Sequence, residues 1–422
     1  MDKNRLKQVI LDQKQEIKSI FNTHIVSREI EPEIKAALKD KLIKVIAGVR
    51  RCGKSFLAHK ILQENTYGYI NFDDERLYGV KSEDLNDLLE LLNEINPGFR
   101  YILLDEIQNI DGWELFVNRL QRSGYNLIIT GSNSNLLSKE LASSLTGRHF
   151  LVELYPFSFK EFLSYKKIDI SDKDLFTTGE KSNIKKTLDE YIEFGGFPEI
   201  SSITFKEQYL RDLYDKIISK DITQRYNIRY VKTLKELALY LISNFGTNIT
   251  YQKLKNIFDV NSVHTIKNYI NYLEEAYLVF QLYPFSFKLK QQVKARKKIY
   301  VVDTGMIGSL SFQFSKNSGK LLENIVFTHL KRKGSEIYFY DYYSGEVDFV
   351  IKEGRNIKGL IQVCMDLENI ETRHRELRSL LKASADLNCS NLKIITYDSE
   401  EELKIKGKKI SLIPIWKWLL DN

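Results

Sequence analysis

The eight residues at positions 48–55, which read GVRRCGKS, constrain the fold of this chain more than any other segment. They follow the short apolar run 43–47 and precede residues 56–62, whose apolar side chains have helical spacing. A strand, a glycine-containing turn and a helix in this order match the pattern GxxxxGK[ST], in which inward-turned backbone N–H groups cradle phosphates. The segment therefore predicts an α/β domain with a phosphate site at a strand–helix connection.

Each part of this loop has a distinct expected role. Lys54 would reach the β- and γ-phosphates of ATP, Ser55 would supply a ligand to Mg²⁺, and the amino end of the following helix would add positive potential. ATP and Mg²⁺ are therefore the expected cofactors. The predicted nucleotide-binding residues are Gly48, Val49, Arg50, Arg51, Cys52, Gly53, Lys54, Ser55 and Phe56.

Two carboxylates end the apolar run at residues 101–106, which reads YILLDE. Such a run describes a buried strand whose carboxyl end carries charge, and in open α/β sheets ligands bind at that edge. We expect Asp105 to hold Mg²⁺ directly or through water, and Glu106 to orient and polarise the water that attacks ATP. An acidic turn after a core strand would be the simpler interpretation without the upstream loop, but the two motifs together predict ATP hydrolysis.

Two further site residues are predicted from their positions next to strand candidates. The run at 126–130 predicts a strand, and Ser132 or Asn133 after it would contact the γ-phosphate and the attacking water, although polar turns follow many strands. Arg148 lies just before the strand candidate at 150–154. It would act as an arginine finger on the nucleotide of a neighbouring subunit, with a surface ion pair as the alternative.

The length of 422 residues exceeds what one compact core holds, so we expect two or three domains. A net charge of +7 favours a polyanionic partner only weakly. Cys52, Cys364 and Cys389 form no CxxC pair, which argues against structural zinc and a disulfide framework. The polar amino terminus and the lack of a run of about 18 apolar residues predict a cytoplasmic protein without a membrane span.

Short apolar runs alternate with amphipathic segments between residues 41 and 160, which predicts a parallel sheet with helices on both faces. The strand candidate not yet named in this region is 67–71. Residues 1–40 and most of 161–234 have helical patterns. A second α/β region is expected over residues 299–422, and its strand candidates are 299–302, 337–340, 347–351, 359–363 and 392–396.

Residues 235–285 have the order of a helix-turn-helix with a wing, because three helical stretches precede the strand-like run 277–282. Ser262 is the expected N-cap of a helix whose outward donors would meet phosphates and base edges. Cations between residues 288 and 298 would add salt-dependent binding to DNA. A solvated helix face, a basic linker or a protein-binding module would have the same composition. The predicted DNA contacts are His264, Lys267, Lys294, Arg296 and Lys297.

Several motifs together resemble the bacterial and archaeal AAA+ ATPases that carry a C-terminal domain of unknown function, DUF4143. The resemblance covers nearly the whole chain. Besides the loop and the acidic pair, the segments that carry it are 145–148 (LTGR), 155–162 (YPFSFKEF), 195–199 (GGFPE), 298–305 (KIYVVDTG), 323–324 (EN), 345–349 (GEVDF) and 361–363 (IQV).

The resemblance implies an α/β fold with a ring-like homo-oligomer, often a hexamer, in which ATP lies between subunits. Residues 195–198 would belong to a helical lid and face the nucleotide. The parts that the resemblance implies are an N-terminal helical segment (1–40), a P-loop AAA+ core (41–160), a helical lid (161–234), a winged-helix module (235–290) and a C-terminal α/β domain similar to the restriction-endonuclease, or PD-(D/E)xK nuclease, fold (291–422).

A nuclease of that fold needs a helical acid, an acid on a strand, and an acid-x-lysine on the next strand. Glu323 and Asp348 fit the first two positions, and Glu346 shares a strand face with Asp348. The third element, residues 362–364, reads QVC, in which the amide is a weak Mg²⁺ ligand and the thiol cannot replace the lysine. We therefore expect a vestigial site, without nuclease activity, at Glu323, Glu346, Asp348 and Gln362.

These features predict an ATPase that couples hydrolysis of Mg-ATP to subunit motions and binds and remodels or moves DNA, either duplex or branched. Two alternatives stay open. The first is an ATP-dependent switch that controls docking of a protein partner, for which ATP turnover would be indifferent to DNA. The second is an ATP-regulated nuclease, for which metal-dependent cleavage would be lost on Asp348→Ala.

Overall fold

The structure is a computed structural model, and it describes residues 2–20, 26–133, 147–168, 170, 177–311, 318–342 and 345–421. The chain divides into two compact units, one formed by Met1–Tyr155 with Glu275–Tyr277 and the other by Pro156–Glu274 with Leu278–Asn422. Part of the LTGR segment, residues 145–146, lies outside the described residues. Within the ranges that are described, no helix combines the length and the apolar character needed to cross a lipid bilayer.

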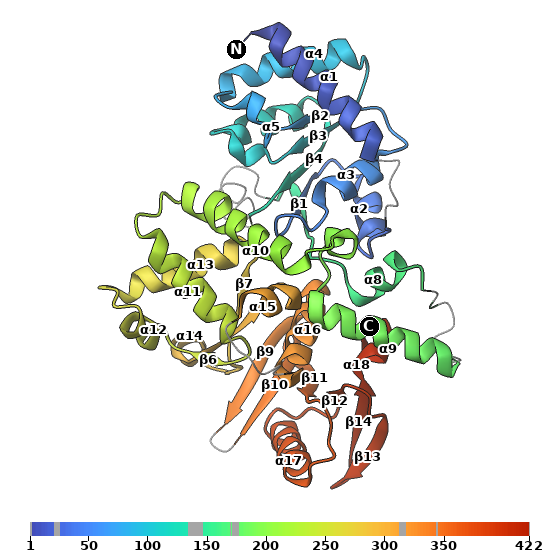
Figure 1. The fold of residues 1–422 in the computed structure, drawn as a ribbon, viewed down its shortest axis with the longest axis vertical. Coiled ribbons are helices and arrows are strands. Elements are labelled where there is room, and N and C mark those ends of the chain that lie inside the picture. Colours follow the sequence, from blue (N-terminus) through green and yellow to red (C-terminus); the bar gives the residue numbers. More distant parts are fainter. Residues whose placement is uncertain are drawn as a thin grey trace. The chain divides into compact units, whose positions relative to one another are not determined.

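A five-stranded parallel sheet in the order β2-β3-β4-β1-β5 forms the centre of the first unit (Figure 1). All five strand candidates of this region and the α/β fold class are confirmed. Because β4 lies between β1 and β3, the segments that follow these three strands are neighbours at one edge of the sheet. The strands are β1 (Ile43–Ala47), β2 (Tyr67–Asn71), β3 (Tyr101–Asp105), β4 (Asn126–Gly131) and β5 (His149–Glu153).

Helices cover both faces of this sheet, which is why every residue of β1 is buried. Three helices share one apolar core with the sheet: α1 (Lys3–Ile20), α4 (Leu85–Ile95) and α5 (Trp113–Arg122). On the other face α3 (Lys54–Leu62) packs against β1, β3 and β4, and α2 (Glu31–Ala37) packs against α3 (Figure 1). Short 3₁₀ turns lie at η1 (Glu75–Leu77), η2 (Ser82–Asp84) and η3 (Ile107–Asn109).

The second unit begins with a series of helices, in agreement with the helical pattern of this region. Capping boxes start two of them, because Ser158 accepts from the N–H of Glu161 and Thr177 from that of Glu180. The elements are α8 (Phe159–Tyr165), α9 (Thr178–Phe194), η4 (Pro198–Ser202), α10 (Lys206–Lys216), the π-helical segment η5 (Ile217–Gln224) and α11 (Val231–Ser243).

The GGFPE and KIYVVDTG segments meet within this unit. The N–H of Gly196 donates to Oδ2 of Asp303 at 2.7 Å, and Asp303 also caps α15 (Thr304–Leu310) by accepting from the N–H of Gly305. Gly195 has φ 77°, and a Cβ at this position would lie 1.7 Å from Oδ1 of Asp303. The glycines are therefore needed for the close approach of the buried Asp303 carboxylate.

A small antiparallel sheet in the order β6-β8-β7 follows, with strands Asn248–Ile249, Lys297–Val301 and Val279–Leu282 respectively. The strand candidate at 299–302 was expected in the C-terminal α/β region but pairs here, because β8 forms its ladders with β6 and β7. Two helices precede the long β7–β8 connection: α12 (Tyr251–Ile257) and α13 (Val263–Glu275).

The C-terminal part contains a six-stranded mixed sheet in the order β13-β14-β12-β11-β10-β9. On one face α17 (Ile370–Asp386) shares an apolar core with β10, β11 and β12, while α16 (Ser318–Arg332) and α18 (Ile415–Asp421) also pack on this sheet (Figure 1). The strands are β9 (Glu336–Tyr342), β10 (Gly345–Glu353), β11 (Asn356–Val363), β12 (Leu392–Thr396), β13 (Glu401–Ile405) and β14 (Lys408–Pro414).

Four of these strands correspond to sequence candidates, whereas β13 and β14 were missed. β13 reads EELKI, and its charged residues lie exposed at the sheet edge. An edge strand needs no continuous apolar run, because one side of its ladder and much of its surface face water. The apolar-run criterion therefore failed for the hairpin that ends the sheet.

Candidate functional site

The loop at residues 48–53 connects β1 to α3 at the carboxyl edge of the five-stranded sheet. A Cβ at Gly48 would lie 2.0 Å from the carbonyl oxygen of Leu154, so only glycine fits there. Arg51 and Gly53 have left-handed backbone conformations, with φ of 67° and 98°, which turn the chain into the first residue of α3. The strand–loop–helix arrangement expected for a phosphate cradle is present.

Lys54 is the first residue of α3 and is only 5% exposed. Its ammonium group donates to the carbonyl oxygens of Gly48 at 3.1 Å and Val49 at 3.3 Å. The same Nζ atom lies 3.6 Å from Oε1 of Glu106 at the end of β3. Lys54 therefore links the two motifs that the sequence placed in one site.

Arg28 holds the loop in place, although sequence analysis did not single it out. Its guanidinium donates from Nη1 to the carbonyl oxygen of Cys52 at 2.9 Å and from Nη2 to that of Tyr155 at 2.6 Å. The side chain is buried. It lies in a segment without a recognisable motif, so only the folded structure reveals this contact.

The other loop residues differ in exposure. Arg50 is partly buried and pairs with Asp73, with 3.1 Å between Nη1 and Oδ2. Arg51 lies exposed, and the Phe56 ring is 41% exposed. Cys52 is buried in the loop as a free thiol. The backbone of the loop, rather than these side chains, is therefore the part that the fold constrains.

Asp105 ends β3 in a buried position, next to Ser55 of α3. Its carboxylate accepts hydrogen bonds from the hydroxyls of Thr130 and Ser55. The hydroxyl of Tyr69 lies 3.5 Å from Oδ2 of the same carboxylate. Burial, with the adjacent charge of Glu106, raises the pKa of Asp105 to about 6. The two predicted Mg²⁺ ligands, Ser55 and Asp105, are thus brought together.

Glu106 follows Asp105 with a left-handed backbone (φ 53°), which turns its side chain toward the loop. Oε2 accepts from the N–H of Ser132 at 3.2 Å and from the side-chain amide of Gln108. Burial alone would raise the pKa of this carboxyl, but the positive charges of Lys54 and Arg50 outweigh it and lower the pKa below its usual value. Glu106 is therefore ionised at neutral pH.

Ser132 and Asn133 follow β4, the strand between those of the loop and the acidic pair. Both are buried, at 1% and 0% exposure. The structure brings Ser132 to Glu106 through its backbone N–H. Asn133 is the next residue along the same turn. Both side chains therefore lie at the carboxyl edge of the sheet, as the sequence predicted.

Arg148 lies exposed immediately before β5, and its carbonyl oxygen accepts from the N–H of Ile43 at 2.9 Å. Ile43 is the first residue of β1, whereas the loop follows the last one. Since β1 and β5 are parallel, Arg148 lies at the opposite edge of the sheet from its own loop. The structure does not bring this arginine to the nucleotide site of the same chain.

The candidate nuclease residues cluster around Lys298, which belongs to the cationic run at 288–298 that the sequence predicts to bind DNA. Nζ of Lys298 lies 2.8 Å from Oε1 of Glu323, 2.5 Å from Oε1 of Glu346 and 3.1 Å from Oδ1 of Asp348. Burial works against the charge on this lysine, yet Tyr300 and the three acids hold its pKa well above the usual value. The ammonium group of Lys298 therefore lies between the three acids.

Gln362 lies beside this cluster. Its Oε1 accepts from the N–H of Asp348 at 3.3 Å, and its Nε2 donates to Oε2 of Glu376 at 2.5 Å. Burial and the charge of Glu323 raise the pKa of Asp348. In the described part of the chain, no group of three or more His, Cys, Asp or Glu residues is arranged to hold a metal ion.

The predicted DNA contacts have different environments. His264 and Lys267 lie exposed on α13, and Lys294 ends the short helix α14 (Leu289–Lys294), also exposed. Arg296 is paired with Asp341, with 2.5 Å between Nη2 and Oδ2. The prediction for Lys297 is wrong, because this residue is 5% exposed and its ammonium group donates to the carbonyl oxygens of residues 293 and 295.

Three family profiles match successive parts of the chain. An AAA domain matches residues 40–163, and two domains of unknown function, DUF8612 and DUF4143, match residues 185–317 and 318–418. The parallel sheet, the phosphate-binding loop and the AAA match define a P-loop ATPase, a protein that binds and hydrolyses ATP. The predicted ATPase class is confirmed.

Two relatives span nearly the whole chain. An uncharacterized protein of Methanocaldococcus jannaschii is 41% identical over 414 residues, which is 93% of this chain and 92% of the relative. An uncharacterized protein of Haemophilus influenzae is 33% identical over 419 residues, covering 94% of this chain and 99% of the relative. The chain belongs to the family of ATPases that combine an AAA domain with a C-terminal DUF4143 domain.

The matches to solved structures are more distant. A Walker-type ATPase of Pyrococcus abyssi is 14% identical, with a TM-score of 0.44, and the match covers 68% of this chain and 96% of that one. The ORC1 protein of Aeropyrum pernix, solved in complex with DNA, is 11% identical with a TM-score of 0.31, covering 68% and 92% of the two chains.

Proposed function

We propose that this ATPase hydrolyses Mg-ATP, with Lys54 on the β- and γ-phosphates and Glu106 as the group that orients and polarises the attacking water. The observation that supports this most is the 3.6 Å separation between Nζ of Lys54 and Oε1 of Glu106. A cation that binds phosphate and an acid that accepts a proton are both needed at the point where the γ-phosphoryl group is transferred. Ser132 and Asn133, beside Glu106, would contact the γ-phosphate and this water.

Ser55 and Asp105 would hold Mg²⁺ in this mechanism. Both offer oxygen atoms, which Mg²⁺ prefers, and the hydrogen bond between their side chains means that one ion could contact both. When bound, the ion would neutralise part of the charge on the β- and γ-phosphates. Thr130, which donates to Asp105, would keep that carboxylate in one orientation.

Glu106 has the properties of a base that is held in place. Lys54 and Arg50 favour its ionised form, so a proton-accepting carboxylate is available at neutral pH. Gln108 and the N–H of Ser132 both hydrogen-bond Oε2. The second oxygen, Oε1, would then accept from water.

We further propose that Arg148 completes the site of a neighbouring subunit in a ring-like homo-oligomer, with a hexamer as the expected form. An exposed arginine at the far edge of its own sheet cannot stabilise charge on the phosphoryl group of its own ATP. The same position leaves the guanidinium available to a second copy of the chain, where it would act as a finger in trans.

We also propose that the protein binds DNA. The binding part would contain α12, α13 and the sheet β6-β8-β7, which we interpret as a winged-helix module. His264 and Lys267 on α13 would contact the DNA backbone or base edges, and Lys294 on α14 would contact phosphates. Lys267 and Lys294 are exposed and form no ion pair with any residue of the described ranges. ATP-driven subunit motions would then remodel or move bound DNA.

The test is ATP turnover by the purified protein with and without duplex and branched DNA, at low and moderate salt. DNA should stimulate turnover, and the stimulation should weaken with salt because cation–phosphate contacts release counterions. The double variant Lys267→Glu/Lys294→Glu should lose the stimulation while keeping basal turnover. Lys404→Glu, an exposed lysine on β13, is the matched charge control. Turnover that ignores DNA in all variants would favour a nucleotide switch acting on a protein partner.

A further inference from the structure

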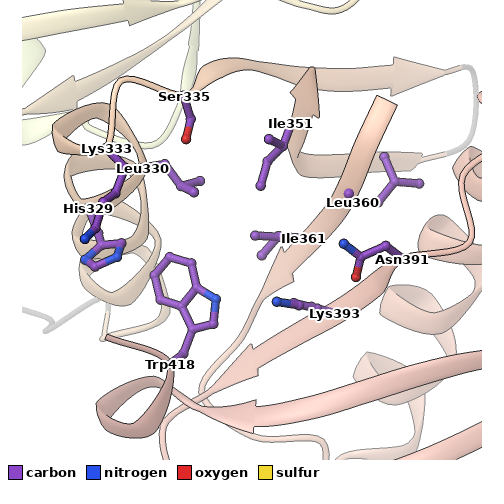
Figure 2. Close-up of a pocket in the computed structure, with 11 residues that line it drawn as sticks. His329, Leu330, Lys333, Ser335, Ile351, Leu360, Ile361, Asn391, Lys393 and Trp418 are labelled. Atoms are coloured by element: carbon purple, nitrogen blue, oxygen red, sulfur yellow. The ribbon is translucent and has the colours of Figure 1, made fainter. Parts of the chain in front are cut away.

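A cavity of about 260 Å³ lies in the C-terminal part, on the face of the six-stranded sheet where α16 and α18 pack. Figure 2 shows the side chains that surround it, with His329 on α16, Trp418 on α18 and Lys393 on β12. It shares no residue with the nucleotide loop or with the Lys298 cluster.

The cavity exists because one position on this face of the sheet, Gly359, has no side chain. Ile351 is paired with Gly359, and Ile361 with Lys393, across neighbouring strands. Because Gly359 has no side chain, the sheet surface is open beside Ile351. A Cβ at position 359 would lie 3.1 Å from Nδ2 of Asn391. The apolar side chains of this face and the Trp418 ring therefore enclose a space that no protein group fills.

The buried side chain of His329 is the main indication that this cavity binds a ligand. It is only 2% exposed, and neither ring nitrogen has a hydrogen-bond partner among the residues that the structure describes. Its ring lies 4.8 Å from that of Trp418. Buried polar atoms without partners are rare, and each one is costly in free energy. A molecule in the cavity could accept a hydrogen bond from one nitrogen of this imidazole.

Two lysines give the cavity its charge. Lys393 extends from β12 and forms no ion pair within the described ranges, and Lys333 follows the end of α16. No Asp or Glu lines the cavity. Burial, with the nearby charges of Arg332 and Lys333, lowers the pKa of His329 to about 3, so the imidazole is neutral and keeps one N–H donor. The lining therefore combines cationic and hydrogen-bond-donating side chains with apolar ones.

We propose that this cavity binds a small organic anion, with its phosphate or carboxylate near Lys393 and a flat apolar portion against Trp418. The volume exceeds the roughly 150 Å³ of an apolar cavity that accommodates benzene, which leaves room for one ring and one charged group. The N–H of His329 donates to the same anion. Charge, hydrogen bonding and a planar apolar wall together define the ligand class.

Titration of the full chain with phenyl phosphate, benzoate and the neutral benzyl alcohol tests this proposal, with thermal unfolding and calorimetry as readouts. The experiment is done in the Lys54→Ala background, which disables the other anion site of the protein. An anionic probe at about ten times its Kd should raise the Tm by about 2–4 °C. Benzyl alcohol should bind at least tenfold more weakly. The tighter of the two anions identifies the charged group.

Two variants separate binding from folding. Lys393→Ala should reduce the affinity for the anionic probes at least tenfold, whereas the exposed Lys404→Ala on β13 should leave it unchanged. His329→Phe should also weaken binding without lowering the Tm of the unliganded protein, because the replaced nitrogens have no partner in the described residues. Equal binding of benzyl alcohol, no binding of either anion, or undiminished affinity in Lys393→Ala would overturn the proposal.

Discussion

The ammonium nitrogen of Lys54 and a carboxylate oxygen of Glu106 lie 3.6 Å apart, although the two residues belong to different motifs of the chain. Both side chains are mostly buried, at 5% and 13% exposure. Each charge stabilises the ionised form of the other in this environment, and the charge of Lys54 helps to keep the pKa of Glu106 below its usual value despite burial. The pair therefore places a buried cation beside an ionised carboxylate at the proposed ATP site.

Replacement of the proposed base, Glu106, should separate ATP binding from ATP hydrolysis. We expect Glu106→Gln to retain ATP binding, because the loop and Lys54 stay intact, and to lose turnover by about 10²–10⁴-fold. Steady-state phosphate release and equilibrium binding of a labelled nucleotide measure the two effects. Glu83→Gln, an exposed acid on η2, serves as the control and should behave as wild type. Unchanged turnover in Glu106→Gln would remove this residue from the proposed role.

Arg148 should act on another subunit. We expect Arg148→Ala to bind ATP normally and to lose turnover by about 10³-fold or more. If Arg148 completes the site of a second copy, as proposed, mixing Arg148→Ala with Lys54→Ala should restore part of the activity that neither variant has alone. Arg122→Ala, at the exposed end of α5, controls for loss of a surface charge. Activity that no mixture restores would argue against a role in trans.

Gly48 is a position where a single methyl group should disrupt the loop. In Gly48→Ala the added Cβ would meet the carbonyl oxygen of Leu154, which is backbone and cannot easily move. We expect a loss of about 3 kcal/mol in unfolding free energy, or an altered loop with weakened ATP binding. Urea denaturation and nucleotide titration measure these effects. Gly179→Ala in α9, where a Cβ meets nothing within 4 Å, should be neutral or stabilising.

Buried histidines should make the protein sensitive to mild acid. His59 is 1% exposed and burial lowers its pKa to about 4, against about 6.5 for an unperturbed histidine. The unfolded chain therefore binds more protons between these values, so the stability is fully present above pH 6.5 and falls as the pH drops toward 4. This one residue accounts for about 2 kcal/mol between pH 7.5 and pH 5.

His59→Phe should remove that part of the pH dependence, because the ring can still pack against Tyr69 without taking up a proton. Denaturation curves at pH 7.5 and pH 5 for wild type and variant give the difference directly. His264→Gln, an exposed change on α13, should leave the pH dependence as it is. A variant with the same loss of stability in acid as wild type would contradict this account of His59.

The lysine among the three acids should keep divalent cations out. We expect Lys298→Met to lower the unfolding free energy by about 3–5 kcal/mol, because it leaves buried carboxylates without their partner. Mg²⁺ or Mn²⁺ should then raise the Tm of this variant but not that of wild type. Lys294→Met, an exposed lysine on α14, is the control. A cation-dependent rise in the Tm of wild type, or metal-dependent DNA cleavage by it, would mean that the nuclease-like site is intact.

Local motifs explain why much of the nucleotide site could be predicted from the sequence. The loop, the acidic pair and the turn after β4 each consist of consecutive residues at the end of an apolar strand. Parallel strands place such ends at one edge, so the residues meet once the sheet forms. The assignment of Lys297 failed for a related reason, since a run of cations does not show which of its members a strand will bury.

The class of this protein can be predicted from local motifs, because a phosphate cradle requires glycines and a lysine at fixed spacing. The distant groups that complete each site are recognised only in the folded chain. Arg28 donates to the phosphate-binding loop, Lys298 pairs with three acids, and His329 lines a cavity together with Lys393. Each of these contacts joins segments far apart in the chain. Such contacts depend on how side chains pack after the strands pair, and no local pattern encodes that packing.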